Sequence, residues 1–188
     1  MEGSPVLATD CGSGPRPLER VVDYPRPPRL DPCALPFRVV ALGQVLAEGD
    51  RSLRVLETFH PPTFYLPPEA LNLAMLQPAP GHSFCEWKGV ARYFDVVLPG
   101  VSGALPQAES GGDRQGPRRL VRAVWQYPEP VPAYAALAGW YAVYPALMEA
   151  IWLDGERVTP QPGGFYGGWI TQEIQGPFKG DPAHPELI

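Results

Sequence analysis

The sequence predicts a mainly β domain with a few short helices. The chain holds 26 prolines and 20 glycines among 188 residues, which favours many turns and short elements over long helices. Short stretches alternate apolar and polar residues, as strands do, and turn signals such as Gly49-Asp50 and Asp154-Gly155 separate several of them. A chain of this length suits one domain with extensions, so we expect one body built from short antiparallel sheets.

The composition divides the chain into four parts. A Gly-, Ser- and Pro-rich N-terminus predicts disorder, and a proline-rich arm follows it. The β core comes next, and the last part alternates glycines with aromatic residues, which predicts a segment lying closely over another surface. These four parts are residues 1–17, 18–36, 37–160 and 161–188. Within the core, the polar and glycine-containing residues 99–117 predict a mobile surface loop.

The arm is expected to pack against the body, because polyproline geometry contains no internal hydrogen bonds. Tyr24, Arg26 and Arg29 are the expected anchors. A flexible linker is the alternative interpretation of the same composition.

Strands are expected at each alternating or β-branched stretch. Turn signals pair the first two strands around Leu42-Gly43-Gln44 and the last two around Asp154-Gly155. Prolines suit a first helical position, and short helices are therefore expected from Pro67 and Pro132. The expected strands are residues 37–47 (two strands), 52–58, 63–66, 84–88, 90–98 (hinged to the preceding strand at Gly89), 118–125, 150–153 and 156–159, and the second helix is residues 132–137.

Charge and cysteine content narrow the class of partner. A net charge of -5 offers no electrostatic support for binding nucleic acid or an anionic membrane. Three cysteines without a CxxC pair disfavour a zinc site and fit a reducing cytoplasm, and no signal peptide or membrane-spanning apolar run is visible. No P-loop, GxGxxG or HExxH motif is present. We expect a cytoplasmic monomer or homodimer that binds a small molecule without metal or cofactor.

The central stretch runs from Glu57 to Pro67, where a strand stops at two consecutive prolines. Proline cannot donate to a sheet and restricts the preceding residue, so His60 is expected in a fixed conformation at a sheet margin. The imidazole is a candidate acid-base group, with Glu57 orienting it or stabilising its charged form. The alternative is that His60 only caps the strand end through a backbone hydrogen bond.

Three further kinds of residue are candidates for the same site. Cys85 is a candidate nucleophile if His60 or Lys88 favours its thiolate, and otherwise a small buried hydrophobe. Lys88 is one of only two lysines in a chain rich in arginine, so a compact ammonium that holds an anion is expected there, with simple surface exposure as the alternative. The aromatic residues expected to contact a ligand are Tyr65, Trp87, Tyr93 and Trp125.

Two hypotheses of different class follow from these residues. In the first, Glu57, His60 and Lys88 are the polar anchors of one small-molecule pocket, whose floor is Cys85, Trp87 and Tyr93, and His60 performs acid-base catalysis if the protein is an enzyme. In the second, Glu57 and His60 pair with each other and leave no cavity. The arm and the last segment would then wrap a partner or a second copy of the chain.

Six segments resemble one known family. They are YPRPPR (24–29), RVLETFHPPTFYLPPE (54–69), CEWKGVARYF (85–94), AVWQYPEP (123–130), DGERVTPQPGGFYGGWIT (154–171) and GPFKG (176–180). The family is domain of unknown function family 427, which also carries a nucleotidyltransferase-like label and has no established activity. The resemblance implies a compact, tent-like arrangement of short sheets with a topology similar to the Mss4-like group.

The chain departs from the family and from its labels in particular places. Zinc-binding CxxC pairs of the Mss4-like group are missing here, so no zinc site is carried over. A GS motif followed by a DxD pair, which nucleotidyltransferases use to hold metal on a triphosphate, is also missing. Phe59 stands where the family more often has a small residue, which implies a narrower pocket, and the loop at residues 99–117 is longer than expected.

Overall fold

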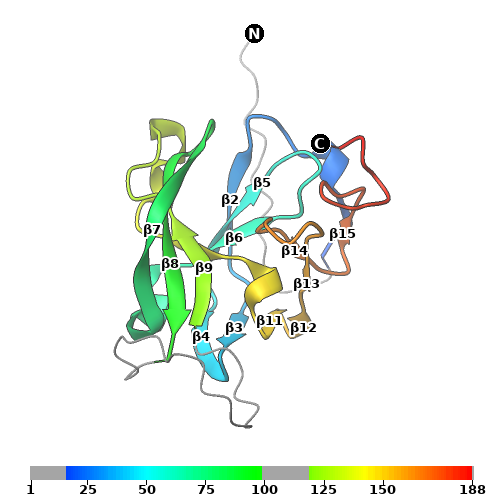
Figure 1. Cartoon of the computed structure of the whole chain (residues 1–188). Coiled ribbons are helices and arrows are strands. Elements are labelled where there is room, and N and C mark those ends of the chain that lie inside the picture. Colours follow the sequence, from blue (N-terminus) through cyan, green and yellow to red (C-terminus); the bar gives the residue numbers. More distant parts are fainter. Residues whose placement is uncertain (1–15, 99–118, 188) are drawn as a thin grey trace.

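The computed structural model describes residues 16–98 and 119–187. The predicted disordered N-terminus lies outside these residues apart from Arg16 and Pro17, and so does the predicted loop at residues 99–117. The described part confirms the mainly β fold: short strands form several small sheets, mostly antiparallel, and none of these closes into a barrel (Figure 1).

Short 3-10 helices, labelled η, connect the strands. The strands are β1 (Glu19–Arg20), β2 (Arg29–Cys33), β3 (Phe37–Ala41), β4 (Gln44–Gly49), β5 (Ser52–Leu56), β6 (Thr63–Tyr65), β7 (Leu76–Cys85), β8 (Gly89–Val97), β9 (Arg119–Gln126), β10 (Tyr141–Val143), β11 (Ala150–Leu153), β12 (Glu156–Arg157), β13 (Thr159–Pro160), β14 (Trp169–Ile170) and β15 (Ile174–Gln175). The helices are η1 (Val21–Asp23), η2 (Pro68–Ala70), η3 (Leu73–Met75), η4 (Pro132–Leu137) and η5 (Pro145–Leu147). The larger sheets have the strand orders β10-β9-β8-β7, β12-β11-β3-β4 and β2-β5-β6, and β1-β15 and β13-β14 are two-stranded.

Two tight hairpins follow from the turn signals in the sequence. Leu42 and Gly43 join β3 to β4 with φ of 52° and 72°, and Asp154 and Gly155 join β11 to β12 with φ of 51° and 77°. Positive φ at both central residues matches the right-handed twist of the flanking strands, and glycine adopts it without steric cost. Both predicted hairpins are confirmed.

The expected strand at residues 84–88 is wrong in its boundaries. β7 begins at Leu76 and ends at Cys85, and the next three residues form the turn of the β7–β8 hairpin. Pro78 lies within β7 and disfavours a strand locally. β7 is the last strand of its sheet, where proline is tolerated because no neighbour needs its missing N–H. The register shifts between Ala79 and His82, as at a β-bulge.

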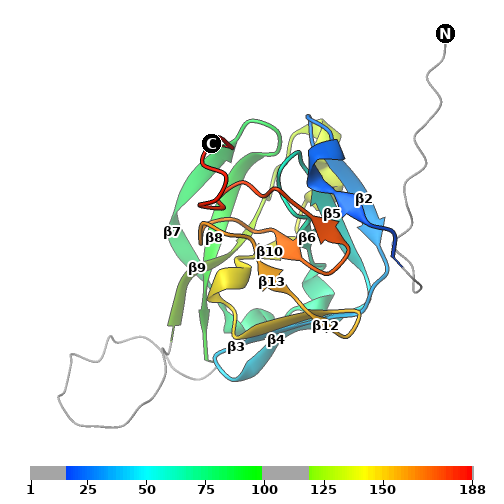
Figure 2. The ribbon, with the colours of Figure 1, turned by 90° about the vertical axis from the view of Figure 1, so that its right-hand side faces the viewer.

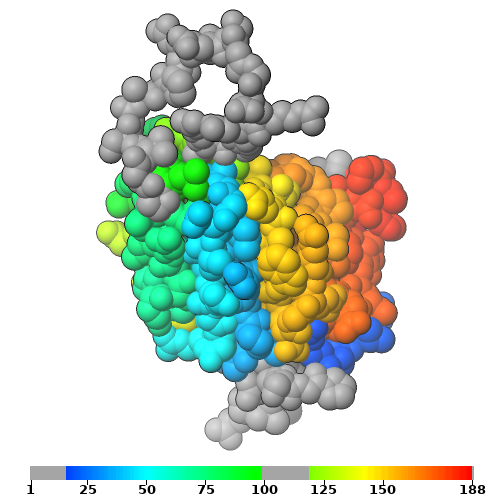
Figure 3. Space-filling view, turned by 90° about the horizontal axis from the view of Figure 1, so that it is seen from below, coloured from blue at the N-terminus to red at the C-terminus, as the bar shows by residue number. Residues whose placement is uncertain are grey.

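The main core packs against the sheet β12-β11-β3-β4. From below, the molecule shows β3 and β4 next to β11 and the following segment (Figure 3). Phe37, Leu46 and Ile151 are buried there. Trp169 is fully buried in the same core and stacks on Phe64 with 4.7 Å between ring centroids. The segment after residue 160 therefore supplies one of the largest side chains of the core.

Two hydrogen bonds join the end of the three-stranded sheet β2-β5-β6 to the four-stranded sheet β10-β9-β8-β7. The N–H of Leu66 donates to the carbonyl of Tyr141 at 2.7 Å, and the N–H of Tyr141 donates to the carbonyl of Leu66 at 2.9 Å. A second cluster of buried side chains, most of them aromatic, lies beside this junction. Its buried aromatic members are Tyr65, Tyr93, Trp125, Tyr127 and Tyr134.

The N-terminal and C-terminal segments of the described chain lie side by side at β1 and β15. β1 pairs in parallel with β15, and the N-terminal and C-terminal segments share one face of the molecule (Figure 2). Of the expected anchors of the arm, Arg26 reaches the body and binds Glu57 at 2.8 Å, and Tyr24 is buried in a cluster with Leu56. The third, Arg29, binds Asp31 at 2.9 Å, a residue of the arm itself.

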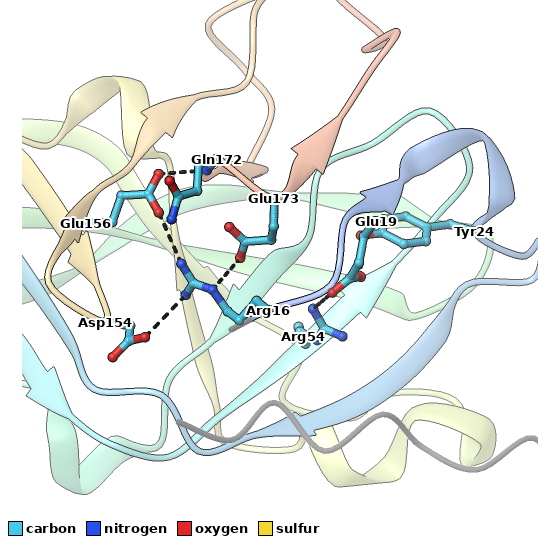
Figure 4. Close-up of polar contacts among 8 residues, drawn as sticks. All are labelled: Arg16, Glu19, Tyr24, Arg54, Asp154, Glu156, Gln172 and Glu173. Atoms are coloured by element: carbon cyan, nitrogen blue, oxygen red, sulfur yellow. Dashed lines mark hydrogen bonds and ion pairs between the residues drawn. The ribbon is translucent and has the colours of Figure 1, made fainter. Parts of the chain in front are cut away.

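Arg16 fastens the N-terminal segment to the C-terminal one. Its guanidinium lies 3.0 Å from Glu173, 3.1 Å from Glu156 and 3.9 Å from Asp154 (Figure 4). The Glu173 side chain is only 7% exposed, so its charge depends on this arginine for compensation. Beside it, Arg54 binds Glu19 at 2.8 Å in a second buried pair.

We expect Arg16→Ala to lower the free energy of unfolding by about 3 kcal/mol, because it leaves the buried carboxylate of Glu173 without a counter-charge. Arg20→Ala is the matched control. Arg20 and Asp23 form a solvent-exposed pair, worth about 0–1 kcal/mol. Urea unfolding monitored by tryptophan fluorescence measures both, and equal losses in the two variants would contradict the structural role of Arg16.

Candidate functional site

A cavity of about 190 Å³ lies between the three-stranded sheet β2-β5-β6 and the four-stranded sheet β10-β9-β8-β7. The segment after β13 forms another wall. Its lining combines aromatic rings, hydroxyl groups, one ammonium, one imidazole and one carboxylate. The lining residues are Val55, Glu57, His60, Thr63, Tyr65, Ser83, Lys88, Ala91, Tyr93, Trp125, Tyr127, Tyr144, Gln161, Phe165, Tyr166 and Gly167.

Lys88 enters the cavity from the turn of the β7–β8 hairpin. The next residue, Gly89, has a φ of 98°, which a residue with a side chain rarely adopts. The Lys88 carbonyl accepts a hydrogen bond from Val131 N–H at 3.2 Å, which fixes the turn. The Lys88 side chain is buried and its Nζ lies 5.9 Å from the ring centroid of Tyr127. None of the carboxylates in the described residues forms an ion pair with it.

His60 lies at the end of a tight turn between β5 and β6. Its N–H donates to the carbonyl of Glu57 at 2.9 Å, and Phe59 has a φ of 66°. The backbone of Phe59 is held from both sides: its N–H donates to Val21 at 3.0 Å, and its carbonyl accepts from Lys179 at 2.8 Å. The prolines that follow His60 end the turn, so both terminal segments fix the position of the imidazole.

Gln161 fixes the tautomer of His60. Its Nε2 lies 3.0 Å from His60 Nδ1 and 2.9 Å from the carbonyl oxygen of Lys179. A backbone carbonyl only accepts, so this end of the amide is the NH₂ group, and His60 Nδ1 must accept its other hydrogen. The proton of the neutral imidazole is therefore on Nε2. Gln161 is 2% exposed, and its Oε1 has no hydrogen-bond partner among the described residues.

Burial lowers the pKa of His60 below its usual range, because the surroundings disfavour the imidazolium. The nearby charges of Lys179 and Arg26 lower this pKa further, whereas the charge of Glu57 opposes the shift. The carboxylate of Glu57 is itself bound by Arg26. The imidazole is consequently neutral near pH 7 and offers an N–H donor.

This arrangement limits what His60 can do chemically. Because Nδ1 accepts from Gln161 and Nε2 carries the proton, the imidazole has no free lone pair with which to remove a proton from a ligand. A neutral imidazole is also a poor proton donor in catalysis, but it is a good hydrogen-bond donor. The geometry therefore suits holding an oxygen atom better than acid-base chemistry.

The remaining walls carry aromatic rings with protonated hydroxyl groups. Trp125 Nε1 donates to the Tyr65 hydroxyl at 3.3 Å, and the hydroxyls of Ser83 and Tyr93 are 2.7 Å apart. Burial raises the pKa of Tyr65 and of Tyr144, so neither phenol carries a negative charge at neutral pH. These walls contribute no charge of their own.

The glycine-rich segment packs tightly against the cavity wall, as its composition predicts. A Cβ added to Gly167 would lie 2.3 Å from the Trp125 ring, and one added to Gly168 would lie 2.4 Å from Gln161 Oε1. Tyr166 meets the imidazole of His60 edge-on, with 5.3 Å between ring centroids. Only glycine allows this approach, and the prediction of a closely laid segment is confirmed.

The structure brings together most of the expected site residues. Glu57, His60, Lys88, Tyr65, Tyr93 and Trp125 line one cavity. Cys85 is a half-buried free thiol at the edge of the aromatic cluster, and neither it nor Trp87 lines the cavity. Phe59 does not line it either, so it does not narrow the pocket as the resemblance implied.

Two relationships in the cavity differ from the sequence analysis. The side-chain partner of His60 is Gln161, whereas Glu57 binds Arg26. Sequence reasoning did not single out the cavity residues Ser83, Tyr127, Tyr144, Gln161, Phe165, Tyr166 and Gly167. The alternation of glycine with aromatic residues was the available signal for the last four of them.

Phe59 is strained in the left-handed region, which costs an L-residue about 1–2 kcal/mol. In Phe59→Gly the relief of this strain offsets the greater flexibility of the unfolded chain, so we expect a change in the free energy of unfolding of no more than about 1 kcal/mol. Phe59→Val keeps the strain and adds a β-branch, and we expect it to be less stable than the glycine variant by about 1–3 kcal/mol. Chemical denaturation measures both, and the opposite order would contradict the turn geometry.

The lowered pKa of His60 predicts acid-sensitive stability. In the unfolded chain the imidazole titrates near about 6.5, so below that pH the unfolded state binds more protons than the folded state. This contribution to stability is present above about pH 6.5 and is lost as the pH falls toward the lower folded-state value. We expect the wild type to lose more stability between pH 7 and pH 5 than His60→Gln, measured by urea unfolding; identical pH profiles would show that His60 is not buried as a neutral group.

Comparison with known proteins places the chain in a family. No curated protein matches the sequence. Within the described residues, no cluster of His, Cys, Asp or Glu could hold a metal ion, and no helix is long and apolar enough to cross a membrane.

The family model described as a domain of unknown function (DUF427) matches residues 29–154, which is more than half of the chain. The chain therefore belongs to the DUF427 family.

Proposed function

We propose that the protein binds a small anionic molecule in the cavity between the sheets β2-β5-β6 and β10-β9-β8-β7. The observation that carries the proposal is the ammonium of Lys88, a residue only 8% exposed that lines the cavity without an ion pair to any described carboxylate. Charged groups of largely buried residues are normally paired in proteins. An anion from solution would supply the missing partner.

His60 supports the same proposal from another side of the cavity. Gln161 holds its neutral tautomer with the proton on Nε2, a suitable donor to a ligand oxygen. The one carboxylate in the lining, Glu57, is already bound by Arg26, which reduces its repulsion of an anion. Lys88 is thus the charge partner and His60 the neutral donor, and the proposed role is binding rather than proton transfer.

We expect Lys88→Met to weaken binding of the best small anion by about tenfold or more, because it removes a charge-assisted hydrogen bond. His60→Gln should weaken binding by less, because it replaces one neutral donor with another. Isothermal titration calorimetry with acetate, benzoate, gluconate and inorganic phosphate identifies that anion.

Arg38→Met is the matched control, since it also removes one positive charge but lies exposed on β3, away from the cavity. Circular dichroism shows whether each variant keeps its fold. If no anion binds the wild type, or if the best anion binds Lys88→Met as tightly as Arg38→Met, the proposal is overturned.

A further inference from the structure

The cavity is small compared with the pockets that bury drug-sized molecules. Its volume is about 190 Å³, whereas pockets that bury drug-sized molecules have volumes of about 300–1,000 Å³. A space of this size suits one six-membered ring with a small charged substituent better than it suits a nucleoside triphosphate.

The charges of the lining indicate a ligand with a single negative charge. Lys88 is the only cation among the described residues of the lining, and Glu57 is paired with Arg26 at 2.8 Å. His60 adds a donor but no charge, because burial keeps it neutral. Bidentate recognition of phosphate typically uses arginine forks, and the lining residues that the structure describes include no arginine. A carboxylate matches this donor set better than a phosphate.

Aromatic rings from both sheets and from the glycine-rich segment form the walls. Tyr65 from β6 and Trp125 from β9 meet edge-to-face with 6.2 Å between centroids, and Trp125 lies 4.5 Å from Tyr144. Tyr166 adds a ring beside His60. Rings pack favourably against other rings at such separations, and flat ligands lose little conformational freedom on binding.

From size, charge and walls together, we infer that the cavity takes a single-ring aromatic carboxylate, with the carboxylate on Lys88 and His60 and the ring among Tyr65, Trp125 and Tyr144. This inference rests on the proposed function and names the ligand class of the same site. Hydroxyl groups such as that of Tyr93 are available to a ring hydroxyl or ring nitrogen of the ligand.

Benzoate is the probe, and three matched compounds separate the contributions in calorimetric titrations. Cyclohexanecarboxylate keeps the charge and size but loses the flat ring, and we expect about threefold to tenfold weaker binding. Benzamide keeps the ring but loses the charge, and we expect about tenfold weaker binding or more. Inorganic phosphate tests the other anion class and should bind more weakly than benzoate. Lys88→Met should weaken benzoate binding about tenfold, whereas Arg38→Met should leave it unchanged.

The outcomes distinguish failure of this inference from failure of the proposed function. If phosphate or gluconate binds in a Lys88-dependent way and benzoate does not, the site binds anions but the inferred ligand class is wrong. Equal affinities for benzoate and cyclohexanecarboxylate would also overturn the class. If no anion binds the wild-type protein, both the class and the proposed function are overturned.

Discussion

The position of the candidate site depends on one strained turn held from two sides. Phe59 adopts a left-handed conformation, and both of its backbone polar groups are bonded, to Val21 near the N-terminus and to Lys179 near the C-terminus. Such a conformation persists only where the surroundings determine it. His60 follows directly, so the terminal segments position the imidazole as much as the neighbouring prolines do.

The same two segments also hold each other. Arg16 bridges three carboxylates that follow β11 or precede β15, and β1 pairs with β15. Buried charges of this kind contribute little net stability compared with apolar packing, but loss of one partner is costly. The arrangement therefore acts as a specific fastening: it keeps the last segment in the register that brings Gln161 to His60.

Local signals in the sequence predicted most of the fold. The hairpins at Leu42-Gly43 and Asp154-Gly155 depend on residues adjacent in the chain, and their turn chemistry was sufficient. β7 was placed incorrectly because Pro78 disfavours a strand locally, and only its position at the sheet edge makes it acceptable. That position is a tertiary property.

The site was predictable only in part for the same reason. Glu57, His60 and Lys88 stand out by residue type and by the prolines and glycine beside them, and they line one cavity. The pairing of His60 with Gln161 spans 101 residues of sequence, and no local pattern indicates which amide will reach which imidazole. Trp87, next to Lys88, was expected to contact a ligand as well. The tight hairpin turn separates the two: Lys88 lines the cavity, and Trp87 packs beside the aromatic cluster.

The tight packing of Gly167 on Trp125 affects how this family should be compared. The region matched by the family model ends at Asp154. Beyond it, Gln161, Tyr166 and Gly167 line the cavity, and Trp169 is buried in the core. An alignment limited to the matched region would compare sites that lack a wall. An expression fragment cut at residue 154 would expose the aromatic interior to water. A comparison of the cavity among homologues therefore has to include the glycine-rich stretch beyond the matched region.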